Sequence, residues 1–276
     1  MIVEFTKMHG IGNDFVVINA ITQQIQLNPL DYSHIADRRF GIGCDQILLV
    51  ESPKEDNIDF HYRIFNADGS EVAACGNGAR CFARYVKEKG LSDKRSLRVA
   101  TSAGVITLTH IDDNLIEVDM GVPRFEPSEI PFSASQRSSE YSLCVEDSEQ
   151  TISAVSMGNP HAVLLVPDVD LAPVERLGPL IEHHKRFPER TNVGFMQVLN
   201  RGEIRLRVFE RGTGETLACG SGACAAVAAG RQLGLLDKEV VTHLRGGDLV
   251  IKWPSEGQSV LMRGPAQTVY EGSIEI

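Results

Sequence analysis

The chain has 276 residues, enough for one large domain or two domains of ordinary size. Hydrophobic residues at 42% and charged residues at 23% are typical of a globular protein, and the net charge of −10 provides no basic surface for nucleic acid. The apolar runs are too short for a transmembrane helix, and the first residues lack the pattern of a signal peptide. We therefore expect a cytoplasmic protein that binds neither nucleic acid nor membrane.

Alternating and β-branched segments predict strands, with breaks rich in Gly, Pro and Asp between them. In the first half they are residues 16–19, 46–50, 60–65, 96–100, 105–110 and 115–120. In the second half they are residues 152–156, 162–166, 196–199, 204–209, 239–244, 248–253 and 259–262.

Helices are fewer, and the helical spacing of apolar residues predicts four of them. They cover residues 29–39, 77–89, 174–183 and 221–233. The last segment reads SGACAAVAAGRQL and is apolar almost all round, which indicates a buried helix. A buried helix inside a strand-rich half suggests a curved sheet wrapped round a central helix.

An internal repeat organises the chain. The sequence ACGNGA around Cys75 returns 144 residues later as ACGSGA around Cys219. Between residues 63–79 and 207–223, 8 of 17 positions are identical, whereas chance gives about one match. We interpret the chain as a duplication, with two halves and a candidate linker at the Pro- and Ser-rich residues 121–139.

Each repeated cysteine lies where a strand turns into a helix, and a Gly-x-Gly follows it. The free N–H groups of a helix N-terminus bind anions and lower the pKa of a thiol. If the two turns faced each other, one thiolate would remove an α-proton while the other thiol protonated the opposite face. Cys75 and Cys219 are therefore the predicted catalytic pair, and this chemistry requires no cofactor and no metal.

The four other cysteines are interpreted as packing residues, because free cysteine is among the most buried residue types. They are Cys44, Cys81, Cys144 and Cys224. Since the chain is long and has no export signal, we expect reduced thiols. No CxxC pair occurs, and the spacings fit no zinc finger.

Several longer motifs resemble those of one known family. They are KMHGIGNDF, GCDQ, FNADGSEVAACGNGARC, SMGNPH, ERTNVGF and FERGTGETLACGSGACA, and they cover essentially the whole length. On these motifs the chain closely resembles the diaminopimelate epimerases. The resemblance implies interconversion of LL- and meso-2,6-diaminopimelate without cofactor, by the two-cysteine mechanism, in lysine and peptidoglycan precursor biosynthesis.

The resemblance also implies a fold and an assembly. The fold is α+β, with two pseudo-symmetric domains that are each a strand-rich, barrel-like sheet wrapped round a central helix. The N-terminal half covers residues 1–119 and carries Cys75, and a last strand, about residues 266–276, returns to it. The C-terminal half covers residues 120–265 and carries Cys219. The site is expected in the cleft between them, and the protein is expected to be a homodimer.

The resemblance assigns further site residues by their motifs. Substrate-binding positions that line the site or hold the far end of the substrate are Asn13, Gln46, Asn66, Asn159, Asn192, Glu210 and Arg211. Positions that hold the reacting carboxylate are Gly76, Asn77, Gly220 and Ser221. Positions thought to tune the site are His161 and Glu210.

Simpler interpretations of these residues stay open from the sequence alone. A lone asparagine is more often a turn residue than a ligand contact, Asn66 above all. Glu210 and Arg211 could form a solvated pair, and His161 could be a hydrogen-bonded structural residue.

Three other functions compete with the epimerase. A proline racemase or hydroxyproline epimerase would use similar paired cysteines, but its substrate has no second zwitterionic end for Glu210 and Arg211. A thiol-redox protein would cycle a disulfide between Cys75 and Cys219, although such proteins usually carry adjacent cysteines. An amino-acid-binding module would explain the polar residues but not the two thiols.

Overall fold

The structure is a computed structural model that describes residues 1–73 and 75–276. Ala74, the first residue of the ACGNGA repeat, lies outside the described residues. Contacts divide the chain into two compact units: unit 1 is Met1–Asp119 with Arg263–Ile276, and unit 2 is Met120–Met262. Each unit is described by itself.

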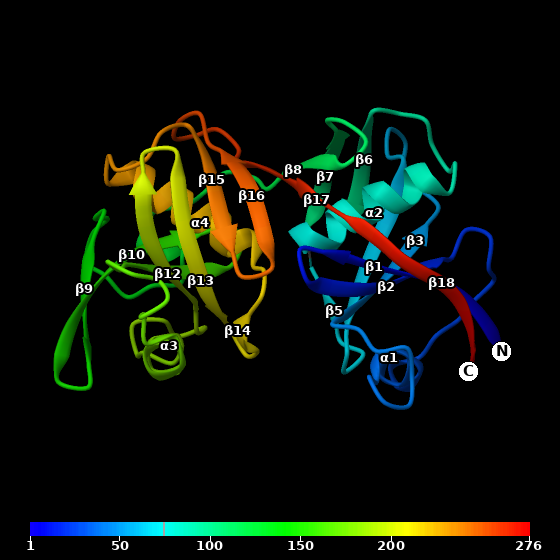
Figure 1. The fold of residues 1–276 in the computed structure, drawn as a ribbon, viewed down its shortest axis with the longest axis horizontal. Helices are drawn as coiled ribbons and strands as arrows, with labels where there is room; N and C mark the ends of the chain where they lie inside the picture. The colour runs from blue at the N-terminus through cyan, green and yellow to red at the C-terminus, as the bar shows by residue number, and fades with distance from the viewer. Residues whose placement is uncertain (74) are drawn as a thin grey trace. The chain divides into compact units, whose positions relative to one another are not determined.

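Unit 1 is a mixed sheet with two helices (Figure 1). Its strands are β1 (Ile2–Gly10), β2 (Asn13–Asn19), β3 (Gln46–Glu51), β4 (Phe60–Asn66), β5 (Glu71–Val72), β6 (Ser96–Thr101), β7 (Gly104–His110), β8 (Leu115–Asp119) and β18 (Gln267–Glu275). Its helices are α1 (Pro29–Ala36) and α2 (Gly76–Glu88). The strands pair in the order β18-β1-β2-β3-β4-β6-β7-β8, and β5 pairs with β4. Helix α2 packs against β1, β2, β3, β7 and β8, so the sheet surrounds it.

Unit 2 is built in the same way around helix α4. Its strands are β9 (Tyr141–Val145), β10 (Ser148–Ser156), β11 (Pro160–Leu165), β12 (Asn192–Asn200), β13 (Glu203–Glu210), β14 (Gly214–Thr216), β15 (Glu239–Leu244) and β16 (Gly247–Lys252). Its helices are η1 (Pro127–Glu129), α3 (Val174–Glu182) and α4 (Gly220–Gln232), and β17 (Leu261–Pro265) contains residues of both units. The pairing order is β9-β10-β11-β12-β13-β15-β16, and β14 pairs with β13.

The two sheets repeat one pattern of strand directions. In unit 1 the pairs β1–β2, β2–β3, β3–β4, β4–β6 and β6–β7 are antiparallel, parallel, antiparallel, parallel and antiparallel. In unit 2 the pairs β10–β11, β11–β12, β12–β13, β13–β15 and β15–β16 follow the same sequence. The predicted α+β class, with one duplicated helix-in-sheet unit, is confirmed.

The four predicted helices are present, with small differences at their ends. Helices α2 and α4 begin one residue earlier than predicted, at the glycine that follows each repeated cysteine. Helix α1 stops at Ala36 rather than at residue 39, because the Asp37 carboxylate accepts the backbone N–H groups of Arg39 and Phe40 and so favours a turn.

The prediction that residues 121–139 form a linker between the two halves is wrong. This segment lies within unit 2, where Ile130 and Phe132 are buried in the hydrophobic core. Most of its residues lie in irregular structure, and its buried apolar residues hold it against the core of the unit. Within residues 1–73 and 75–276, no helix is long and apolar enough to cross a membrane.

Candidate active site

In unit 1 the Cys75 sulfur sits at the N-terminus of helix α2. Cys75 is the N-cap residue, and its sulfur accepts the backbone N–H of Gly78 at 3.5 Å. The thiol donates to Oδ1 of Asn13 at 3.7 Å, and Nδ2 of Asn77 donates to the same oxygen at 3.2 Å. Nδ2 of Asn13 donates in turn to the Asp45 carboxylate at 2.8 Å. Three predicted site residues, Cys75, Asn13 and Asn77, are therefore brought together around one sulfur.

A fully buried arginine supports this cluster, although it is not among the site residues predicted from the sequence. Arg80 donates through Nη2 to Oδ1 of Asn77 at 3.0 Å and through Nη1 to the carbonyl of Gly76 at 3.4 Å. Its Nε donates to the carbonyl of Pro265 at 3.1 Å. Arg80 thereby fixes the Asn77 amide with its N–H₂ group toward Asn13. The available signal was an arginine within an otherwise apolar stretch of a buried helix.

Gln46 and Asn66 form a second polar pair in unit 1. They are opposite each other on β3 and β4, and Nε2 of Gln46 donates to Oδ1 of Asn66 at 3.0 Å. Nδ2 of Asn66 donates to the Ser70 hydroxyl at 3.1 Å, and its backbone closes the β4–β5 turn through Gly69. Asn66 is thus partly the turn residue that the simpler interpretation expected.

In unit 2 the Cys219 sulfur has the equivalent place at the N-terminus of α4. It accepts the backbone N–H of Gly222 at 3.4 Å and lies 3.7 Å from the Ser221 hydroxyl. Cys219 is only 3% exposed, whereas Cys75 is half-buried. The two predicted cysteines therefore cap equivalent helices with nearly equal sulfur–amide distances.

The pKa of Cys219 is raised, whereas we expected the helix N-terminus to lower it. Burial raises the pKa of this thiol well above its ordinary value, and the Glu210 carboxylate raises it further. The Ser221 hydroxyl and the Gly222 N–H act in the opposite direction but do not prevail. Loss of hydration outweighs the helix N-terminus here, so Cys219 is a protonated thiol at neutral pH in this structure.

The remaining predicted residues of unit 2 are linked in short hydrogen-bonded groups. Oδ1 of Asn192 accepts the backbone N–H of Arg211 at 3.0 Å, and Nδ2 of Asn192 donates to the carbonyl of Pro160 at 3.0 Å. The Glu210 carboxylate accepts the Thr216 hydroxyl at 2.5 Å. Asn192 is buried and Arg211 is exposed, so the buried amide sets the backbone from which the Arg211 side chain extends.

His161 is buried, and its Nε2 lies 3.0 Å from Oδ1 of Asn159. Burial, together with the positive charge of Arg211, lowers the pKa of His161 to about 3. The imidazole is therefore neutral at physiological pH. His161 therefore acts on Asn159 as a neutral hydrogen-bonding group and not as a positive charge.

This pKa predicts a pH dependence of stability. The fold depresses the His161 pKa from 6.5 to about 3, so below pH 6.5 the unfolded chain binds a proton that the folded chain does not. We expect the free energy of unfolding to fall as the pH drops from about 6.5 toward 3, and His161→Gln to reduce that fall. Denaturant unfolding at pH 7 and pH 4 measures it, with His183→Gln, an exposed histidine, as control. Equal pH dependence in the wild type and His161→Gln would contradict the assignment.

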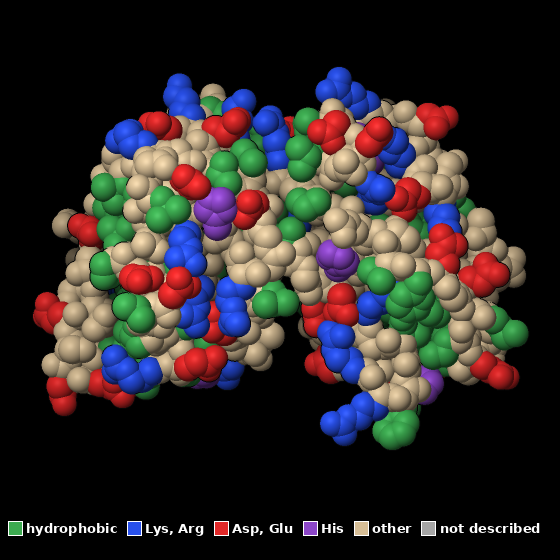
Figure 2. Space-filling view, viewed as in Figure 1, with side chains coloured by type: hydrophobic (Ala, Val, Ile, Leu, Met, Phe, Trp, Pro, Cys, Tyr) green, Lys and Arg blue, Asp and Glu red, His purple; other side chains and the backbone are tan. Residues whose placement is uncertain are grey.

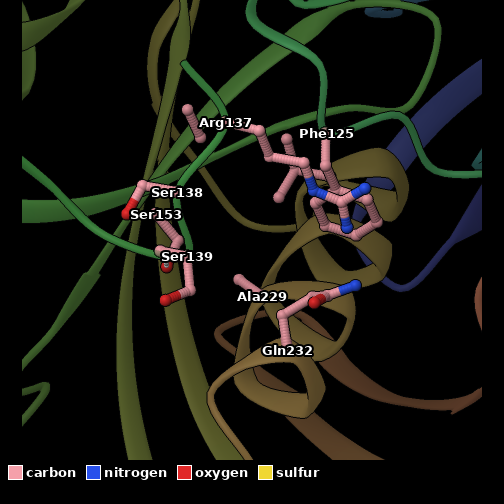
Figure 3. Close-up of a pocket in the computed structure, with 9 residues that line it drawn as sticks. Phe125, Arg137, Ser138, Ser139, Ser153, Ala229 and Gln232 are labelled. Atoms are coloured by element: carbon pink, nitrogen blue, oxygen red, sulfur yellow. Dashed lines mark hydrogen bonds between the residues drawn. The ribbon is translucent and has the colours of Figure 1, made fainter.

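A cavity of about 290 Å³ lies elsewhere in unit 2 (Figure 3). Its lining residues are Phe125, Arg137, Ser138, Ser139, Ser153, Ala154, Val155, Ala229 and Gln232, and they include none of the predicted site residues. Its charged group, Arg137, lies over the Phe125 ring and forms an ion pair with Glu256 at 2.6 Å. The cavity therefore presents no thiol and a guanidinium that already has a partner, and we do not assign the reaction to it.

Solved structures define the class of fold. A hydroxyproline epimerase from Agrobacterium vitis is similar, with a TM-score of 0.71 and 16% identity, over 99% of this chain and 92% of that chain. A PhzF-family phenazine biosynthesis protein from Bacillus anthracis is similar, with a TM-score of 0.72 and 18% identity, over 100% of both chains. These identities are low, so they show the fold alone, which is the duplicated fold of the PhzF and proline racemase-like epimerases.

Sequence relatives are more specific. The model of the diaminopimelate epimerase family matches residues 5–126 and 153–269. A diaminopimelate epimerase of Nitrosomonas europaea is 58% identical over 276 residues, and one of Chromobacterium violaceum is 55% identical over 276 residues, each over 100% of both chains. The chain belongs to the diaminopimelate epimerase family.

Proposed function

We propose that this protein interconverts LL- and meso-2,6-diaminopimelate by cofactor-independent proton transfer at the α-carbon, a step of lysine and peptidoglycan precursor biosynthesis. Relatives 55–58% identical over their whole length are named diaminopimelate epimerases. The observation that carries the proposal is the pair of equivalent cysteine caps, with sulfur–amide distances of 3.5 Å at Cys75 and 3.4 Å at Cys219. Two equivalent thiols suit a reaction that removes a proton from one face of a carbon and adds one to the other.

In the proposed reaction one cysteine thiolate takes the α-proton and becomes a thiol. The other thiol gives its proton to the opposite face and becomes a thiolate, so the two sulfurs exchange states in each turnover. The raised pKa of Cys219 suits the donor state, and the roles reverse in the opposite direction. As the α-proton leaves, negative charge spreads onto the substrate carboxylate, which backbone N–H groups at a helix N-terminus stabilise.

The side chains suggest how the substrate is held. We assign the reacting carboxylate to the first turns of α2 and α4, through Gly76, Asn77, Gly220 and Ser221. We assign the far ammonium and carboxylate of diaminopimelate to the polar side chains Asn66, Asn159, Asn192, Glu210 and Arg211, because carboxylate and guanidinium groups pair with such ends. Asn13 and Gln46 line the same site, and His161 acts through Asn159. Proline has no second charged end, which favours diaminopimelate over the proline-type alternative.

We also propose that the protein is a cytoplasmic homodimer. All six cysteines carry free thiols in the described chain, which suits a reducing compartment. The dimer rests on the family resemblance. Light scattering during size-exclusion chromatography is expected to give a mass of twice 30.2 kDa.

The test is proton NMR of the reduced protein with LL-diaminopimelate in D₂O, without added cofactor. We expect deuterium to enter the α-position as the meso isomer forms. The matched substrate is L-proline, for which we expect no exchange. Exchange with proline and none with diaminopimelate would favour the proline racemase alternative, and exchange with neither would favour the binding module.

A further inference from the structure

Each unit contains the same two-pronged ion pair. In unit 1, Nε and Nη2 of Arg63 donate to Oε1 and Oε2 of Glu71 at 2.9 and 2.8 Å. In unit 2, Nε and Nη2 of Arg207 donate to Oε1 and Oε2 of Glu215 at 2.7 and 2.8 Å. These four residues belong to the eight identities of the repeat, so both the residue types and the geometry are duplicated. We call each pair a clamp.

Each clamp joins a long strand to the short strand that leads to a cysteine. Glu71 lies on β5 opposite Phe65 of β4, and Glu215 lies on β14 opposite Phe209 of β13. Strand β5 has 2 residues and β14 has 3 residues, so few backbone hydrogen bonds hold them. In each unit the cysteine follows the glutamate by four positions. A bidentate arginine–carboxylate pair strengthens the attachment of such a short strand to its neighbour and fixes its orientation.

We propose that the Arg63–Glu71 and Arg207–Glu215 clamps are positioning pairs for the thiols of Cys75 and Cys219. This inference rests on the proposed function for its catalytic meaning, but the placement of each thiol is measurable without substrate. The clamp holds the strand before the cysteine, and the helix N-terminus holds the sulfur after it. Together the two fix the sulfur from both sides, which proton transfer to a carbon requires.

The clamp of unit 2 is the more buried one. The side chains of Arg207 and Glu215 are 18% and 4% exposed, against 33% and 36% for Arg63 and Glu71. Arg245 adds a second contact to Glu215 at 3.2 Å. Figure 2 shows Lys and Arg side chains beside Asp and Glu on the face of unit 2 that carries β13 and β15. Because a buried pair has less competition from water, removal of Arg207 is expected to have a larger effect than removal of Arg63.

A neighbouring ion pair provides a matched control. Arg205, on the same strand β13, forms a two-pronged pair with Asp170 at 2.8 and 3.0 Å. Asp170 lies far in sequence from β14, the strand that leads to Cys219, and Arg207 contacts its backbone carbonyl, at 3.5 Å, rather than its carboxylate. Arg205→Met therefore removes the same charge and the same kind of pair from the same strand, and leaves the clamp in place.

The experiment compares Arg207→Met with Arg205→Met in the full-length reduced protein. The readouts are the alkylation rates of Cys219 and Cys75 by iodoacetamide, followed by mass spectrometry of each peptide, and kcat and KM in both directions. In Arg207→Met we expect alkylation of the buried Cys219 to rise about tenfold and kcat to fall by a similar factor, because a small displacement of a reacting group is costly. Cys75 and the Arg205→Met protein are expected to react as in the wild type.

Two further variants test the clamps if the first variant does not fold. If Arg207→Met does not fold, Arg207→Lys, which keeps the charge but not the two-pronged contact, and Arg63→Met in the more exposed clamp replace it. A lower unfolding midpoint with an unchanged alkylation rate and unchanged kcat would make the clamps merely structural. Faster Cys219 alkylation in a protein that does not act on diaminopimelate would uphold the clamp and overturn the proposed function.

Discussion

Cys75→Ser and Cys219→Ser are each expected to lower kcat/KM for diaminopimelate epimerisation by about 10³-fold, since general acid–base catalysis contributes on this scale. A serine hydroxyl keeps the hydrogen-bonding shape of the thiol but ionises far less readily. It therefore neither removes the α-proton nor returns one at a useful rate. The rates of meso formation from the LL isomer, and of the reverse reaction, measure the effect.

The two variants should differ in what they retain. In each, the remaining cysteine still serves one face of the α-carbon, so we expect slow deuterium exchange without inversion from one isomer, and from opposite isomers in the two variants. Cys144→Ser is the matched control, because Cys144 lies on β9, outside the proposed site, and is exposed rather than the packing residue expected from the sequence. Full epimerisation by both single variants would refute the two-cysteine mechanism.

The sequence pattern predicted those elements that are stabilised by residues close together in the sequence. The helices were found because apolar spacing and a glycine stop are sequence-local signals, as in α2 and α4. The short strands β5 and β14 were missed, because two or three residues carry no periodicity. Their pairing is instead supported by an arginine eight positions earlier on the adjoining strand, as with Arg207 and Glu215.

Only part of the candidate site could likewise be predicted from the sequence. The cysteine caps followed from the repeat alone, and the polar residues at the far end came only from the family resemblance. Arg80 was missed because its partner Pro265 lies 185 residues away, so only the fold shows that this charge is satisfied. The raised pKa of Cys219 was also missed, because the burial that causes it depends on tertiary packing.

Gly78→Ala is expected to destabilise the protein by about 2 kcal/mol, the usual scale for overpacking a buried site. A Cβ at Gly78 would lie 2.4 Å from the Tyr62 hydroxyl and 3.2 Å from Cε1 of Phe15. Tyr62 is fully buried, so its ring has no space into which to move. The first turn of α2 would shift instead, and with it the N–H group that Gly78 donates to the Cys75 sulfur. Epimerase activity should therefore fall together with stability.

A second substitution, Tyr62→Phe, is expected to relieve the clash that Gly78→Ala creates. The Tyr62 hydroxyl has no hydrogen-bond partner among the described residues, so Tyr62→Phe alone should cost little, because it removes a buried unsatisfied group. Combined with Gly78→Ala it removes the atom that the new methyl group meets, and the double variant should regain most of the lost stability and activity. Urea unfolding of the four proteins gives the coupling energy, expected at about 1–2 kcal/mol.

Unit 2 supplies the control for this cycle. Leu206 occupies the position equivalent to Tyr62, and a Cβ at Gly222 would meet Val208 at 3.0 Å and the Cys219 sulfur at 3.1 Å. Gly222→Ala should therefore also reduce activity, but Tyr62→Phe should not rescue it, and the two effects should add. If Tyr62→Phe left Gly78→Ala uncorrected, the helix N-terminus at Cys75 would not depend on the close approach of Tyr62. If it restored both stability and activity, Gly78 is required because Tyr62 lies directly against it.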